Sequence, residues 1–168
     1  MIRLVALAFA TVIIASACGA ESDSAACAAK SGGAYEDQAE VYSWPVYCPT
    51  FLPPEFVLES ATFADVDSPM PDAVLSTVKF VDEDDNVITL FQGFILIVPR
   101  DERGLPTVQP TQEVDFGDIP AQLFITGRNT PLIRSMGSES PTRAIRGSLG
   151  LDPAILVAVA EGMTRVES

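Results

Sequence analysis

The sequence AVLSTVKFVDEDDNVITLFQ, residues 73–92, contains the clearest β-hairpin pattern in the chain. In its first half Val74, Val78 and Phe80 fall on one face, and polar residues such as Thr77 and Lys79 fall on the other, which is typical of a half-buried strand. Five polar residues, DEDDN, then precede a second apolar run, VITLFQ. A connection of this length between two such runs predicts an antiparallel hairpin.

Further strands are predicted on both sides of the hairpin. Residues 56–63, FVLESATF, form one candidate, and Gly93 predicts a bulge or a bend before the apolar run at 94–98. Shorter strands are predicted at residues 113–116, 121–126 and 142–148, the last as an edge strand. Residues 127–142 have little pattern, and only 131–133 are apolar enough to pack.

The end of the sequence predicts one helix. Asp152 is a typical N-cap, Pro153 suits the first helical position, and Gly162 lies where the helix would end. The apolar residues at helical spacing are Ile155, Leu156, Val159 and Met163. We therefore predict an α+β fold, an antiparallel β-sheet packed against a C-terminal α-helix, in a single domain at residues 41–168.

An export signal peptide is predicted at residues 1–17. Fourteen uncharged residues, LVALAFATVIIASA, follow Arg3, a length too short for a permanent transmembrane helix. With Cys18 directly after them, the last small residues resemble the lipobox of bacterial lipoproteins. This resemblance implies that Cys18 carries lipid and anchors the protein to the cell membrane on its extracytoplasmic side. Cleavage at an ordinary signal-peptide site would instead give a secreted protein.

Residues 18–40 are rich in Ala, Ser, Gly, Glu and Asp, a composition that cannot bury enough apolar surface to fold. We expect a flexible tether there. If Cys18 is acylated, Cys27 and Cys48 remain as an even pair in an oxidising compartment, which predicts a disulfide. The alternative is that Cys27 stays unpaired in the tether.

Aromatic residues and prolines gather just after the tether. Tyr42, Trp44 and Tyr47 lie among four prolines within residues 41–54, and these prolines exclude a helix. Such aromatic side chains either stack on a sugar or peptide, or form an apolar lid at one end of the core.

The composition argues against several classes of function. The formal net charge of −13 at pH 7 argues against nucleic-acid binding, because neutralising phosphates requires clustered Lys and Arg. The chain contains no histidine, which excludes Ser-His-Asp triads, Cys-His pairs and histidine-ligated zinc. A carboxylate pair such as Asp65 with Asp118 would serve an enzyme, but their spacing does not distinguish them from surface acids. No catalysis is expected.

Two groups of polar or charged residues are candidate sites. The acidic connection offers calcium ligands at alternate positions, which are Asp82, Asp84 and Asn86. Val87 stands where an EF-hand loop needs glycine, so the alternative is a solvated hairpin tip without a cofactor. An anionic ligand such as a phosphate head group or a carboxylated glycan would suit Arg128, Arg134, Arg143 and Arg146. The alternative is that these arginines pair with acids across the same sheet.

Several segments resemble a family of bacterial extracytoplasmic domains that are tethered as lipoproteins or joined to membrane-bound anti-sigma-factor and lipoprotein-carrier-like proteins. The matching residues are 45–53, PVYCPTFLP, with Phe56 and Leu58; residues 87–92; Gly117 with Ala121 and Leu123; and Gly150, Leu151, Asp152, Pro153, Leu156, Ala158, Ala160, Glu161, Gly162 and Met163. The resemblance covers residues 45–163. It implies an antiparallel α+β domain with a closing helix and no assigned catalysis.

The leading functional hypothesis is a lipid-anchored binding or interaction module of the cell envelope, with an unidentified envelope protein or ligand as its partner. One alternative is a carrier of a small apolar ligand or lipid head group, which would need a cavity behind residues 91–97. A carboxylate-based enzyme and a calcium-binding module are further alternatives.

Overall fold

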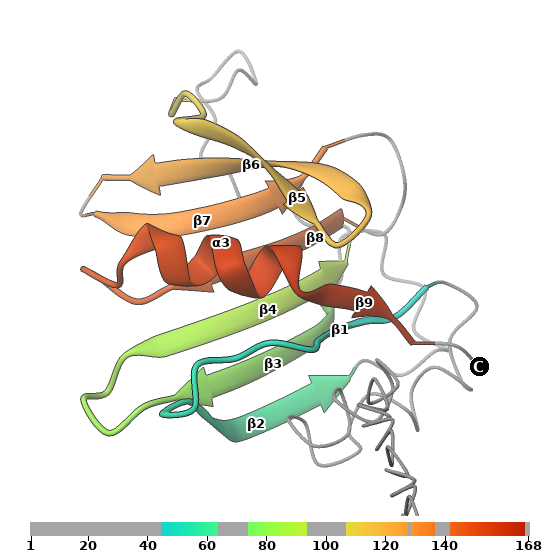
Figure 1. The fold of residues 1–168 in the computed structure, drawn as a ribbon, viewed down its shortest axis with the longest axis vertical. Helices are drawn as coiled ribbons and strands as arrows, with labels where there is room; N and C mark the ends of the chain where they lie inside the picture. Colours follow the sequence, from blue (N-terminus) through green and yellow to red (C-terminus); the bar gives the residue numbers. More distant parts are fainter. Residues whose placement is uncertain (1–44, 64–73, 94–106, 128, 137–141, 167–168) are drawn as a thin grey trace, which may run out of the picture.

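The structure, a computed structural model, describes residues 45–63, 74–93, 107–127, 129–136 and 142–166 (Figure 1). Within these ranges the elements are β1 (Tyr47–Pro49), β2 (Val57–Phe63), β3 (Val74–Val81), β4 (Val87–Gly93), β5 (Gln112–Phe116), β6 (Ile119–Thr126), β7 (Thr130–Ser135), β8 (Thr142–Gly147), α3 (Pro153–Glu161) and β9 (Met163–Arg165). The predicted signal peptide and tether at residues 1–40 lie outside the described residues, as does the apolar run at 94–98.

Seven strands form one antiparallel sheet in the order β2-β3-β4-β8-β7-β6-β5, and β1 pairs with β9 in a separate two-stranded ribbon. Figure 1 shows α3 and this ribbon lying over the same face of the large sheet. We call this face the inner face and the opposite one the outer face. The described chain is thus mostly antiparallel sheet with a C-terminal helix, a β-rich form of the predicted α+β class.

The predicted hairpin at residues 73–92 is confirmed as β3 and β4. Val81 pairs with Val87, so five residues connect the two strands. Phe80 is fully buried on the inner face, whereas the neighbouring Lys79 is exposed. Because a shift of one residue would exchange the two faces, this alternation fixes the register of the hairpin.

The prediction of an edge strand at residues 142–148 is wrong. β8 lies in the middle of the sheet, with β4 on one side and β7 on the other. Its sequence, TRAIRG, carries two arginines, and charged side chains are typical of edge strands. Arg143 nevertheless has only 2% of its surface exposed, because β1 covers it on the inner face. The strand β7, from the weakly patterned segment 127–142, completes the centre of the sheet.

Helix α3 begins at the predicted N-cap. The Asp152 carboxylate accepts a hydrogen bond from the Ala154 N–H at 2.9 Å, and Pro153 occupies the first helical position. The helix ends at Glu161, and Met163, predicted on its apolar face, belongs instead to β9. The buried residues of the helix are Leu156, Val159 and Ala160. In the described part of the chain, no helix has the length and apolarity needed to cross a membrane.

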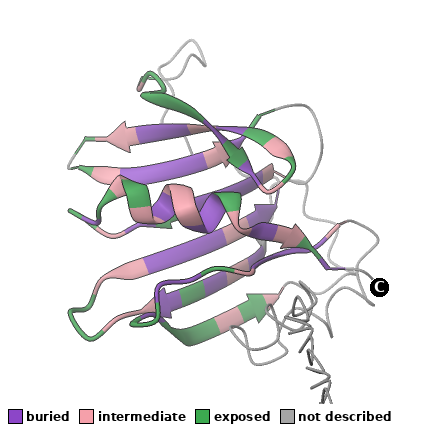
Figure 2. Ribbon diagram, in the orientation of Figure 1, coloured by how far each residue is buried: buried purple, intermediate pink, exposed green. Residues whose placement is uncertain are grey.

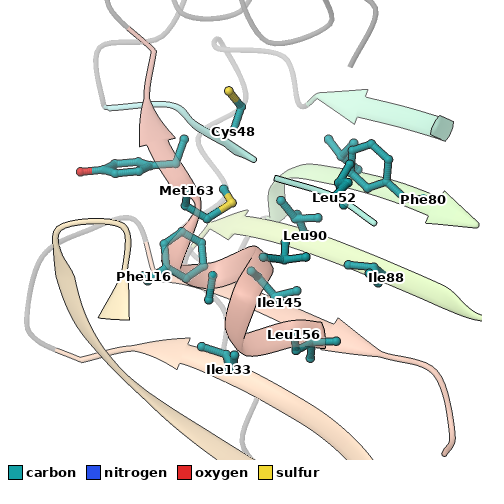
Figure 3. Packing of buried hydrophobic residues seen from close by; sticks show 14 of the residues in the cluster. Cys48, Leu52, Phe80, Ile88, Leu90, Phe116, Ile133, Ile145, Leu156 and Met163 are labelled. Carbon is teal, nitrogen blue, oxygen red and sulfur yellow. The ribbon is translucent and has the colours of Figure 1, made fainter. Parts of the chain in front are cut away.

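One apolar core fills the space between the inner face and its cover. Leu156 of α3, Ile145 of β8 and Ile133 of β7 are fully buried in it and lie close together in Figure 3. Burying one such side chain stabilises the fold by about 1.5–3 kcal/mol. Figure 2 shows that burial is concentrated in the central strands, whereas the edge strand β2 is mostly exposed.

Gly117, in the β5–β6 turn, connects the sheet to the end of the helix. Its φ of +61° lies in the left-handed region, and its N–H donates a hydrogen bond to the Ala160 carbonyl at 2.8 Å. A Cβ atom at this position would collide with the Met163 carbonyl oxygen. The turn therefore requires glycine for both its backbone conformation and its close approach to the helix end.

Candidate ligand-binding site

A pocket of about 220 Å³ lies at the neighbouring strands β6 and β7 and is lined by Gln122, Phe124, Arg134, Ser135 and Met136. Gln122 pairs with Arg134, and Leu123 pairs with Ile133. Leu123 and Ile133 belong to the inner core, and successive side chains of a strand point to opposite faces. Gln122, Phe124 and Arg134 therefore lie on the outer face, and we call this hollow the outer-face pocket.

A second apolar cluster lies beside the pocket on the outer face. It comprises Phe124, Leu132 and Ala144, each at most 5% exposed, and Val108 packs against it. Phe124 belongs to both the cluster and the lining of the pocket. The pocket therefore combines a fixed aromatic ring with the polar side chains of β6 and β7.

Two of the predicted anion-binding arginines share this outer face. Arg134 pairs with Ala144, and Arg146 pairs with Leu132, so the two arginines are diagonal neighbours on β7 and β8. Arg134 is half-buried, whereas Arg146 is exposed. The Arg146 guanidinium lies 5.4 Å from the centre of the Phe91 ring, a cation–π distance that orients its side chain over the outer face.

The structure does not bring Arg143 to this site. Its side chain lies on the inner face, with the guanidinium carbon 4.3 Å from the centre of the Tyr47 ring. Its backbone N–H donates a hydrogen bond to the Ser135 hydroxyl at 3.1 Å. Arg128, the fourth predicted ligand, lies outside the described residues.

Tyr47 is held by several neighbours on the inner face and is only 5% exposed. Its hydroxyl donates a hydrogen bond to an Asp118 carboxylate oxygen at 3.3 Å. Its ring packs edge-to-face with that of Phe116, and the two ring centres lie 6.3 Å apart. The Gln92 amide bonds to both the N–H and the carbonyl of Tyr47. Desolvation raises the pKa of Tyr47, although the positive charge of Arg143 opposes the shift. These contacts support an apolar lid rather than a stacking platform at this position; Tyr42 and Trp44 lie outside the described residues.

The proposed calcium ligands form the turn between β3 and β4. The Asp82 carboxylate accepts hydrogen bonds from the backbone N–H groups of Asp84 and Asn86 and from the Asn86 side chain, at 2.7–2.9 Å. Desolvation acts to raise the pKa of Asp82, but these hydrogen bonds outweigh it and hold the pKa below its ordinary value. Within the described ranges, no group of three or more His, Cys, Asp or Glu residues is arranged to hold a metal ion.

Other predicted site residues fall partly outside the described ranges. Cys48 is fully buried in β1 and disulfide-bonded, but Cys18 and Cys27 are not among the described residues. The Cys27–Cys48 pairing and the lipidation of Cys18 therefore stay predictions. Asp118 bonds to Tyr47, and its proposed catalytic partner Asp65 is also outside the described part.

Several lining residues of the pocket carry no recognisable motif, namely Gln122, Phe124, Ser135 and Met136. One signal was present in AQLFIT, residues 121–126. Alternation places Ala121 and Leu123 on one face, and the large apolar Phe124 then falls on the other. An aromatic residue on the expected polar face indicates that this face is also partly buried.

Comparisons of the chain with protein-family models, curated proteins and solved structures find no match. The resemblance of residues 45–163 to bacterial extracytoplasmic domains stays a prediction. The candidate site is defined by the geometry of the outer-face pocket.

Proposed function

We propose that the chain is a lipid-anchored extracytoplasmic binding module that holds its ligand in the outer-face pocket and performs no catalysis. The main support for this proposal is that Phe124, an almost fully buried ring, lines the same pocket as Arg134 and Gln122. Binding sites commonly combine an apolar surface with a few polar groups that orient the ligand.

The chemistry of the lining residues favours binding over reaction. General acid–base catalysis requires groups such as a carboxylate, a histidine or a thiol. The side chains that the described residues offer to the pocket are an amide, a guanidinium, a thioether and a phenyl ring, whereas the Ser135 hydroxyl accepts the Arg143 N–H. These groups orient and desolvate a ligand without supplying an acid–base pair.

The size of the pocket favours a small ligand over an apolar carrier. Its volume of about 220 Å³ lies below the roughly 300–1,000 Å³ that is typical of sites for drug-sized molecules. A lipid carrier would need more apolar volume than this. The pocket instead suits a small molecule or the end of a longer chain.

The proposed location rests on the leader and on Cys18. A lipid on this cysteine, followed by the tether at residues 18–40, would hold the acidic domain near the membrane surface outside the cytosol. The acidic net charge disfavours direct adsorption to anionic lipid, so the acyl chains supply the attachment.

The proposal is tested in the native cells with two measurements. Mass spectrometry of the mature N-terminus is expected to find lipid on Cys18. A photo-crosslinking residue at Met136, on the rim of the pocket, is expected to capture a ligand that the same residue at Val57, exposed on the distant strand β2, does not capture. An unmodified Cys18 thiol, or the same crosslinks from both positions, would contradict it.

A further inference from the structure

We infer that the outer-face pocket recognises a carboxylate that lies beside an amide and an apolar group, as in an N-acylated amino acid or the C-terminus of a peptide. This inference rests on the proposed binding function and names the ligand chemistry. Its central element is Arg134 on β7, which lines the pocket together with Phe124 and Gln122.

Arg134 is the cation that lines the pocket. Arg146 is its diagonal neighbour on β8, but its guanidinium lies over the Phe91 ring of β4, so it adds positive charge near the pocket without lining it. A guanidinium presents paired N–H donors that match the two oxygens of a carboxylate.

The rest of the lining matches the groups next to the carboxylate. Phe124, 5% exposed, provides a small and rigid apolar surface, and Met136, 39% exposed, provides a flexible thioether that adapts to different apolar side chains. Gln122 carries both a donor and an acceptor, which are the complements of a peptide C=O and N–H. An inorganic anion would use only Arg134 and leave these contacts unmade.

Lys79 is a further cation on the outer face, outside the pocket. The Lys79 Nζ lies 3.6 Å from a Glu59 carboxylate oxygen, and both side chains are nearly half exposed. Lys79 lies on β3, two strands away from Arg146 on β8. Thr89 of β4 lies between them, because it pairs with both residues. Lys79 therefore provides a matched control, a cation on the same face outside the proposed site.

The inference is tested by titrating the full chain with N-acetylphenylalanine, followed by calorimetry or NMR. Saturable binding is expected, and Arg134→Gln should weaken it by about tenfold or more, with a smaller loss in Arg146→Gln. Lys79→Gln should change the dissociation constant by less than about twofold. N-acetylphenylalaninamide, which lacks the carboxylate, should bind about tenfold more weakly than the acid.

Further ligands identify the source of the carboxylate. A tripeptide ending in phenylalanine that binds more tightly than N-acetylphenylalanine indicates a peptide C-terminus, and the reverse order indicates a free acyl amino acid. Equal binding of the acid and its amide, no binding of the acid, an unchanged affinity in Arg134→Gln, or tighter binding of inorganic phosphate would each overturn the inference.

A folding defect would not prevent the test. If Arg134→Gln unfolds, Arg134→Lys keeps the charge but loses the paired donors, so a folded Arg134→Lys chain with full affinity would contradict the proposed pairing. The failure of this inference also differs from failure of the proposed function. A ligand captured at Met136 but not displaced by N-acetylphenylalanine would leave the binding module in place with another ligand.

Discussion

The guanidinium of Arg143 lies against the face of the Tyr47 ring, 4.3 Å from its centre, in a place where Arg143 is only 2% exposed. This contact joins β8, in the middle of the sheet, to β1, which lies over the inner face. The Tyr47 hydroxyl extends the connection to Asp118 in the β5–β6 turn. Gln92, in register with Arg143, bonds to the backbone of Tyr47. These contacts fix the ribbon over the buried cation.

We expect a large coupling energy between Arg143 and Tyr47. Removing the ring in Tyr47→Leu leaves a buried charge without its aromatic neighbour and should cost about 3 kcal/mol or more. In a double-mutant cycle with Arg143→Met, urea unfolding should give a coupling of about 1–2 kcal/mol. The control is the pair Arg146 and Phe91, in which Arg146 is exposed, so that water screens the contact and the coupling should be near 0.5 kcal/mol. Equal couplings for the two pairs would contradict a specific role for burial.

The Tyr47 hydroxyl should make stability depend on pH in the alkaline range. Its pKa is raised above the ordinary value of 10.0, mainly by desolvation, so the unfolded chain loses this proton before the folded chain does. The contribution is therefore complete below pH 10 and is lost as pH rises through the folded-state pKa. At pH 8, Tyr47→Phe should be less stable by about 1 kcal/mol, because it lacks the bond to Asp118. Denaturation curves should show this difference shrinking above pH 10, and a constant difference would argue against the raised pKa.

The elements that could be predicted from the sequence are those that depend on local pattern. The β3–β4 hairpin follows from alternation around one polar turn, and α3 follows from Asp152, Pro153 and a run of apolar residues. The pairing of β1 with β9 joins the two ends of the domain, for example Cys48 with Thr164, and no local pattern specifies it. The central position of β8 could not be predicted, because a charged residue such as Arg143 is typical of an edge strand. Its burial depends on Tyr47, which is distant in the sequence.

The candidate site could be predicted only in part for the same reason. The sequence predicts Arg134 and Arg146 as anion-binding residues, but only the register of β7 with β8 shows that both lie on the same face of the sheet. The same register places Arg143 on the other face. The pocket itself depends on the pairing of Gln122 with Arg134 and on the burial of Phe124, which are properties of the assembled sheet.

Substitutions of three glycines should separate backbone strain from steric collision. Gly117→Ala should destabilise the fold by about 2–3 kcal/mol, because its φ is positive and the new Cβ would meet the Met163 carbonyl oxygen. Gly150→Ala has a φ of +80° but open space around it, so only the strain of about 1 kcal/mol is expected. Gly127→Ala has neither feature and should change stability by less than about 0.5 kcal/mol. Thermal or urea unfolding gives the three values, and a harmless Gly117→Ala would contradict the close approach.

The Asp82 carboxylate should act as a structural part of the β3–β4 turn, and its contribution should disappear in acid. Its pKa lies below the ordinary 3.8, since hydrogen bonds from Asn86 and Asp84 overcome the opposing effect of desolvation. The stability that it supplies is therefore present above pH 3.8 and is lost as pH falls through the folded-state pKa. Asp82→Ala should lower the urea midpoint at pH 7, and its difference from the wild type should shrink in acid. Asp84→Ala, which removes a carboxylate but leaves the backbone donor, is the matched control and should change the midpoint less.

If calcium added after chelation raised the melting temperature of the wild type and Asp82→Ala abolished that rise, the Asp82 carboxylate would be a metal ligand instead. Because its oxygens already accept three short hydrogen bonds within the turn, we expect calcium to leave the melting temperature unchanged.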